Sequence, residues 1–122
     1  MAEEIKRLEN ISDEYLYSLS AKDGNIILHF ENSKLFFKSY LIFKNGYPNI
    51  DVSIVQEKFG ENDIESSVLY QVTNSSWITE ITIANRIHPD HKDELFENLI
   101  HFLIFFHDET FECIADSYEI KR

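Results

Sequence analysis

Two histidines in the second half of the sequence have a spacing that could serve a metal. His88 and His91 lie three residues apart, with Asp90 and Glu94 beside them. Imidazole and carboxylate groups bind zinc, but a structural zinc site has four protein ligands, and the chain has one cysteine instead of a cysteine pair. Histidines among acidic residues at the start of a helix are typical of solvated capping positions. We therefore predict that the chain binds no metal and no cofactor.

A second group of reactive side chains follows at His107-Asp108-Glu109 and Cys113. A cysteine near a histidine can act as a nucleophile when its thiol is deprotonated. Cys113 alternates with Phe111 and Ala115, however, as on one face of a strand, and a buried cysteine behaves as a small apolar residue. The sequence contains no phosphate loop, dinucleotide fingerprint or nucleophile elbow. We predict that the protein is not an enzyme.

The remaining chemical feature is an excess of carboxylates. The formal net charge is −11, and nine acidic residues stand against one base, Lys92, between His88 and Ile120. A surface of this charge repels nucleic acids and anionic membranes and attracts basic proteins. We therefore predict that this part of the chain binds a basic partner protein. The expected contact residues are Asp93, Glu97, Asp108, Glu109, Glu112 and Asp116.

Two segments have the spacing of helices that would position these groups. Pro89 suits the first turn of a helix, and Leu95, Leu99 and Phe102 recur at helical intervals after it. This pattern predicts one main helix from about residue 89 to residue 104, packed on a sheet. A short helix is expected over residues 2–10.

The rest of the chain alternates between apolar and polar residues, as strands with one buried face do. Asp23-Gly24 and Asn45-Gly46 are strong signals for two-residue hairpin turns. A last strand is expected over residues 110–120, with a bulge near Asp116-Ser117 that brings its apolar residues to one face. The other predicted strands lie within residues 15–19, 26–30, 35–43, 50–54, 68–72 and 79–83. The predicted fold is α+β, with an antiparallel meander of about six strands, in a single domain over residues 1–122.

Length and composition indicate a globular chain in a reducing compartment. The 122 residues are 43% hydrophobic, and a chain of this size can bury a core without disulfides. The single cysteine allows no internal disulfide. The first ten residues lack the apolar core of a signal peptide, and the longest apolar stretch, residues 99–106, is too short to span a bilayer. We expect a cytoplasmic protein.

In overall character the chain resembles the small bacterial immunity proteins that neutralise toxins, such as those of contact-dependent growth inhibition. The features that it shares with them are its length, its strong negative charge, its single sheet-and-helix domain and its lack of catalytic motifs. The resemblance implies tight binding to a cognate toxin, commonly a nuclease, with its active site or substrate groove blocked. No family residue is carried over, because no diagnostic motif is present.

Two other functions remain open at this point. The chain could be a small enzyme or ligand-binding domain, with His29, His107 or tyrosines lining a pocket in a curved sheet. It could also be an acidic secretion chaperone, a class that is also commonly small and acidic. A toxin-like reading frame beside the gene would favour the immunity protein over both.

Overall fold

The computed structural model describes residues 3–11, 15–46, 65–106 and 109–122. In these residues the chain forms nine strands, the α-helix α2 (Ser76–Asn85) and the short 3-10 helix η1 (Asp93–Phe96). All the strand pairs are antiparallel. The predicted α+β class is therefore confirmed, whereas a single meander of about six strands is wrong.

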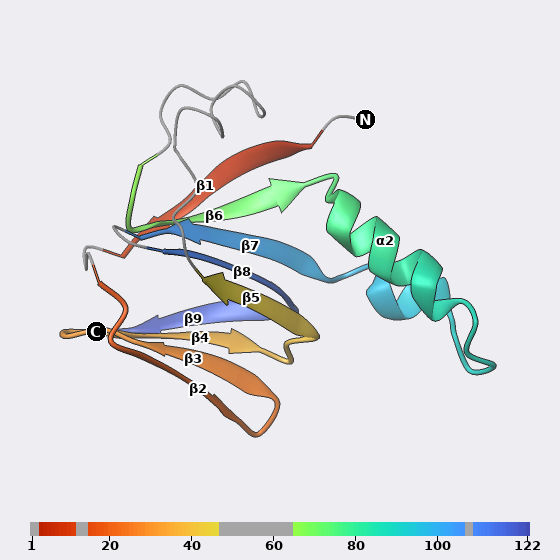
Figure 1. Cartoon of the computed structure of the whole chain (residues 1–122), viewed down its shortest axis with the longest axis horizontal. Helices are drawn as coiled ribbons and strands as arrows, with labels where there is room; N and C mark the ends of the chain where they lie inside the picture. The colour runs from red at the N-terminus through yellow and green to blue at the C-terminus, as the bar shows by residue number, and fades with distance from the viewer. Residues whose placement is uncertain (1–2, 12–14, 47–64, 107–108) are drawn as a thin grey trace.

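The strands form two sheets. The five-stranded sheet has the order β1 (Glu4–Asn10), β6 (Val68–Thr73), β7 (Ile100–Phe105), β8 (Thr110–Ala115) and β5 (Ile42–Gly46). The four-stranded sheet has the order β2 (Ser18–Lys22), β3 (Asn25–His29), β4 (Lys34–Lys38) and β9 (Ser117–Lys121). In Figure 1 the five-stranded sheet lies above the four-stranded sheet, and α2 lies beyond the right-hand ends of the strands.

The main hydrophobic core joins the inner faces of both sheets. Phe37 of β4 is fully buried, and its ring centroid lies 5.0 Å from that of Phe102 in β7 and 5.5 Å from that of Phe111 in β8. Cys113 is buried in the same core, as its alternation predicts. Burial raises the pKa of the Cys113 thiol, and the nearby Glu112 carboxylate raises it further. This cysteine is therefore a packing residue and not an activated nucleophile.

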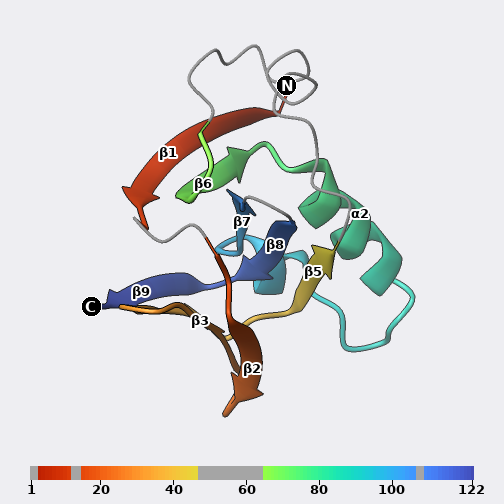
Figure 2. The same ribbon diagram turned by 60° about the vertical axis from the view of Figure 1, so that its left-hand side comes forward.

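Two chain segments pass from one sheet to the other. β4 continues into β5 and β8 continues into β9, and the two segments pair with each other on both sides of the crossing. Ser39 takes a left-handed φ of 52° at the crossing, and the Asp116 N–H donates to the Lys38 carbonyl oxygen at 2.9 Å. Figure 2 shows β8 running into β9 and the orange-to-yellow chain rising into β5.

These crossings correct two predicted long strands. Residues 35–43 are not one strand, and the change near Asp116-Ser117 is a change of sheet, not a bulge. The expectation that the apolar residues on both sides of it share a face is confirmed, because Tyr118 and Ile120 pack against the same core as Phe111.

The predicted main helix over residues 89–104 is wrong. Only η1 is helical there, and the apolar run that follows is β7. β7 is buried on both faces, with Phe102 and Ile104 in the main core and Leu103 and Phe105 in a second cluster. A strand that is buried on both faces has no polar alternation, so its periodicity does not distinguish it from a buried helix.

The predicted strand at residues 79–83 and the predicted helix at residues 2–10 are also wrong. The first segment belongs to α2, and the second contains β1, which pairs with β6. Branched residues such as Thr79 and Thr82 favour strands, yet both hydroxyls donate to the carbonyl four residues earlier, at 3.2 and 2.7 Å, which fits them into a helix.

The two predicted hairpin turns have different outcomes. Asp23 and Gly24 have φ values of 54° and 80° and join β2 to β3, so this turn is confirmed. Asn45 and Gly46 pair with Phe111 and Thr110 inside β5, so they do not form a turn. The strand predicted at residues 50–54 lies outside the described residues. None of the described helices is long and apolar enough to cross a bilayer.

Candidate functional site: a projecting acidic lobe and its anchor

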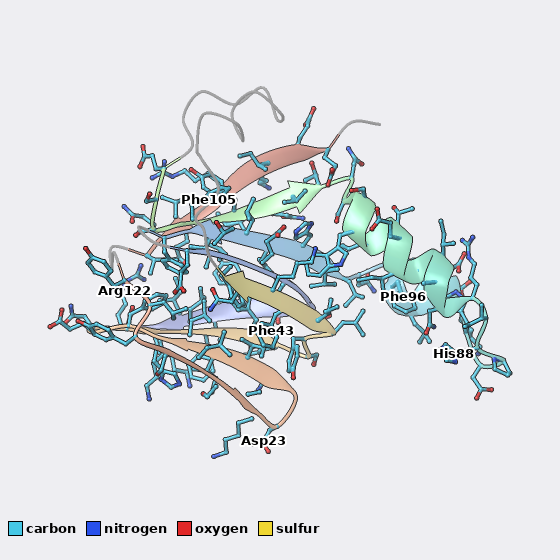
Figure 3. The ribbon with its side chains drawn as sticks, viewed as in Figure 1. Asp23, Phe43, His88, Phe96, Phe105 and Arg122 are labelled. Carbon is cyan, nitrogen blue, oxygen red and sulfur yellow. The ribbon has the colours of Figure 1, made fainter. Side chains whose placement is uncertain are left out.

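The helical segment between β6 and β7 projects from the end of the five-stranded sheet. We call residues 76–99, which contain α2, η1 and the connecting turns, the lobe. No residue of α2 is buried, which is unusual for a ten-residue helix. Figure 3 shows His88 and Phe96 in the lobe, on the opposite side of the molecule from Arg122. Contacts other than a buried helix face must therefore hold this exposed segment in place.

The start of α2 is capped from two places in the chain. Ser75 is the N-cap, and its Oγ accepts the Ile78 N–H at 3.2 Å. Glu3, from the N-terminal segment, accepts the Ser76 N–H at 3.2 Å and the Ser76 hydroxyl at 3.1 Å. α2 has no acidic residue in its own first turn, so Glu3 supplies the negative charge that the positive end of the helix dipole favours.

Ser75 also begins a polar relay that connects α2 to the sheet. Its Oγ lies 2.8 Å from His101 Nδ1, and His101 Nε2 lies 2.9 Å from Glu112 Oε1. His101 and Ser75 are only 5% and 7% exposed. Ser75 and Glu112 thus engage both ring nitrogens of His101. The relay therefore satisfies a histidine that is buried under α2.

An aromatic ring and a cation stand next to the relay. The Trp77 ring meets the His101 ring edge-on at 5.2 Å between centroids, and Lys44 Nζ lies 4.1 Å from the centre of the indole ring. Lys44 is on β5 and Glu112 is its register partner on β8. Three strands and the first turn of α2 therefore meet at this point.

Serine, histidine and a carboxylate in this order are also the groups of an acyl-transfer triad. Here the Ser75 hydroxyl already caps α2 and is withdrawn from solvent. In such triads the serine bonds to Nε2, whereas in this relay it bonds to Nδ1. This geometry suits a clamp that fixes the helix better than a nucleophile that must reach a substrate.

A second polar network ties the far end of α2 to η1. Arg86 binds both oxygens of Asp93, at 3.1 Å from Nε and 2.8 Å from Nη2. His91 Nε2 contacts the same carboxylate, and Asn85 Nδ2 lies 2.8 Å from His91 Nδ1. The Arg86 guanidinium, and after it His91, lower the pKa of Asp93 to about 2. Asp93 is therefore a structural carboxylate, because its charge is already compensated.

Large apolar side chains are exposed on the lobe among further carboxylates. Ile83, Ile87 and Leu95 are 53%, 84% and 64% exposed. A hollow in the lobe surface is lined by Pro89, Asp90, His91, Lys92 and Leu95. The lobe carries five carboxylates against Arg86 and Lys92. Those not committed to the Asp93 network are the exposed Glu80, Asp90, Glu94 and Glu97.

The predicted partner-binding residues do not form one surface. Asp93 and Glu97 lie in the lobe, whereas Glu112 lies in the sheet and bonds to His101. Glu109 is in the turn between β7 and β8, at the opposite end of β7 from the lobe. Asp116 is exposed where β8 passes into β9, and Asp108 lies outside the described residues.

The residues considered for a metal site have other surroundings than a metal site would give them. His91 has both ring nitrogens engaged, by Asn85 and Asp93, while His88 is exposed. In the described part of the chain no three histidine, cysteine, aspartate or glutamate side chains gather as metal ligands would.

Sequence reasoning missed the anchor residues Ser75 and His101. His101 falls within the helix predicted over residues 89–104, and Ser75 falls between the strands predicted at residues 68–72 and 79–83. The available signal was the serine pair in TNSS, since serine is a preferred N-cap. The capping-box glutamate three residues later is replaced by Ile78, and the charge comes instead from Glu3, which no local pattern reveals.

Comparison with protein-family models, curated proteins and solved structures found no match to this chain. The geometry defines an α+β protein with two antiparallel sheets and an anchored, exposed, acidic and apolar lobe.

Proposed function

We propose that the protein is a binding protein that uses the lobe to capture a basic partner protein. The observation that carries this proposal is the exposure of Ile83, Ile87 and Leu95 on a fixed helical segment among carboxylates. Exposed apolar groups with a polar rim are typical of protein interfaces. The apolar side chains supply the desolvated centre, and the carboxylates guide a basic surface toward it.

The resemblance to immunity proteins extends this proposal to a particular kind of partner. The partner is a bacterial toxin, most simply a nuclease, because nucleases present basic surfaces to nucleic acid. The protein neutralises it by covering that surface and performs no chemistry itself. The anchoring of α2 at Ser75 and Glu3 supports this function, since a fixed lobe loses little conformational entropy when the complex forms.

The test is a search for a toxin-like reading frame beside the gene, followed by a growth assay with it; the absence of such a frame counts against a toxin as the partner. Expression of that toxin alone should arrest growth, and co-expression of the parent protein should restore it. Ile87→Asp with Leu95→Asp should abolish rescue and weaken binding of the purified toxin by about tenfold or more. The matched control is Leu41→Asp with Ile42→Asp, which changes two exposed apolar residues at the start of β5 and just before it. If both double variants lose rescue and toxin binding equally, or if neither loses them, the lobe is not the interface.

A second pair of variants tests the electrostatic part of the proposal. Glu94→Lys with Glu97→Lys should slow association, and the difference from the parent should shrink at high salt, because exposed charges are screened beyond about 8 Å at physiological ionic strength. Glu4→Lys with Glu31→Lys is the control, since both residues are exposed outside the lobe. Glu112 is unsuitable for such a reversal, because it holds His101.

The enzyme remains the rival function, and the Ser75–His101–Glu112 order is the observation that favours it. A reactive phosphonate ester discriminates between the two, because it labels an activated serine covalently. We expect mass spectrometry to show no adduct on Ser75. An adduct that disappears in the His101→Gln variant would support catalysis instead.

A further inference from the structure

The outer face of the four-stranded sheet carries an excess of positive charge, whereas the chain as a whole is negatively charged. Along each strand alternate residues point into the core, which leaves the others on the outside. The outward residues are Ser18, Ser20 and Lys22 on β2, Asn25, Ile27 and His29 on β3, Lys34, Phe36 and Lys38 on β4, and Ser117, Glu119 and Lys121 on β9. This basic face carries four lysines and one carboxylate, on a chain of net charge −11.

The lysines at one end of the basic face are placed against each other. Lys34 and Lys121 are direct register partners across β4 and β9, and His29 is the partner of Lys34 on the other side. Like charges directly opposite each other destabilise a sheet. In the described part of the chain no carboxylate lies within ion-pair distance of either lysine. This pairing gathers positive charge at one end of the basic face.

The single carboxylate of the basic face is already engaged. Glu119 lies 2.8 Å from Lys38 Nζ, and the hydrogen bond and charge of Lys38 lower the pKa of Glu119, with a smaller effect from Lys121. Glu31 lines the hollow that Lys34 and Lys121 share beyond the end of the sheet, and it is exposed. The cations of the basic face therefore outnumber the carboxylates available to them.

Apolar side chains lie beside this pair. Phe36 and Ile27 are register partners beside the Lys34–His29 pair, and both are only partly buried on the face that points away from the core. Lys121 Nζ lies 4.8 Å from the centre of the Phe36 ring. The face thus combines cations at one end with an apolar centre.

We propose that the basic face binds an acidic, partly apolar polypeptide segment of another protein. Its carboxylates pair with Lys34 and Lys121, and an apolar side chain covers Phe36 and Ile27. A single-stranded nucleic acid fits less well, because it stacks successive bases on several rings, and Phe36 is the one phenylalanine, tyrosine or tryptophan among the outward residues named above. A net charge of −11 also opposes a long polyanion more than a short acidic segment. This binding surface is independent of the lobe, which has the opposite charge.

The test uses a short labelled peptide of alternating glutamate and leucine as the probe, with fluorescence anisotropy at two salt concentrations. The parent should bind the peptide, and binding should weaken at the higher salt. Lys34→Glu with Lys121→Glu should weaken it by about tenfold or more, which corresponds to the loss of about 1.4 kcal/mol. Lys6→Glu is the matched control, because Lys6 is an exposed lysine on β1, and it should bind as the parent does.

A stability measurement separates a binding role from a folding role. Lys34→Glu alone places a carboxylate opposite Lys121, so its Tm should equal or exceed that of the parent while peptide binding falls. The proposal is overturned if the peptide does not bind, if a glutamine-leucine peptide binds equally well, or if the double variant binds like the parent. Tighter binding of oligothymidylate than of the peptide also overturns it, in favour of nucleic acid.

Discussion

At the scale of single residues, Asp93 shows how a charge can be removed from a binding surface. The sequence predicts that its carboxylate contacts a partner protein. In the structure Arg86 and His91 bind this carboxylate within the lobe. Its charge therefore fixes the turn between α2 and η1. Contacts with a partner are left to exposed neighbours such as Glu94 and Glu97.

This role of Asp93 predicts that the free energy of unfolding depends on pH. The folded pKa of Asp93 is about 2, below the value of about 3.9 in an unfolded chain. The ionised carboxylate therefore contributes stability above about pH 4, and that contribution is lost as the pH falls toward about 2. In Arg86→Gln the folded pKa should rise toward the unfolded value. The free energies of unfolding of parent and variant, measured in urea, should then converge as the pH is lowered.

NMR titration of the Asp93 carboxyl carbon measures the same effect directly. The control is Lys92→Gln, which removes a cation from the lobe without touching the Asp93 network, and it should leave the pKa near 2. An unchanged Asp93 pKa in Arg86→Gln would show that the Arg86 contact is not what depresses it.

At the scale of secondary structure elements, α2 depends on groups outside itself. Its sequence is rich in branched residues and it buries none of them, so propensity and packing are both weak. The Ser75 cap, the Glu3 carboxylate and the relay to His101 are what keep it helical and in place.

Removing the Ser75 hydroxyl should therefore be costly. Ser75→Ala removes the N-cap and leaves Nδ1 of the buried His101 without its partner, for a combined loss of about 2 kcal/mol in the free energy of unfolding. Ser18→Ala, at an exposed position of β2, is the control and should change it by less than about 0.5 kcal/mol. If urea denaturation gives the same free energy of unfolding for Ser75→Ala and Ser18→Ala, the relay does not stabilise α2.

At the scale of the whole molecule, stability comes from the core that both sheets share. Phe37 is fully buried and contacts rings from two strands of the opposite sheet, whereas Phe43 on β5 is 37% exposed. Phe37→Ala should lower the free energy of unfolding by about 3–5 kcal/mol, because the cavity lies between the sheets.

Phe43→Ala is the matched comparison, and its cost should be clearly smaller, since the site is open to water on one side. Urea denaturation followed by far-UV circular dichroism measures both. Similar losses for the two variants would argue against a core centred on Phe37.

The sequence by itself determined features that depend on near neighbours. The Asp23-Gly24 turn was predictable because a two-residue hairpin needs positive φ at both positions. The burial of Ile26, Leu28 and Cys113 followed from period-two alternation, which marks the inward face of a strand. The excess of negative charge, and with it the expectation of a basic partner, also came from composition alone.

Only the tertiary structure decided the features that depend on residues far apart in the chain. Residues 100–105 are a strand because neighbours cover both of its faces, and α2 is a helix because Glu3 and His101 hold its first turn. The predicted acidic contact residues do not form one surface because tertiary contacts place them apart. Glu112, for example, bonds to the buried His101. The net charge of the chain gave no sign of the basic face, because strand pairing brings together Lys34 and Lys121, which are far apart in the sequence.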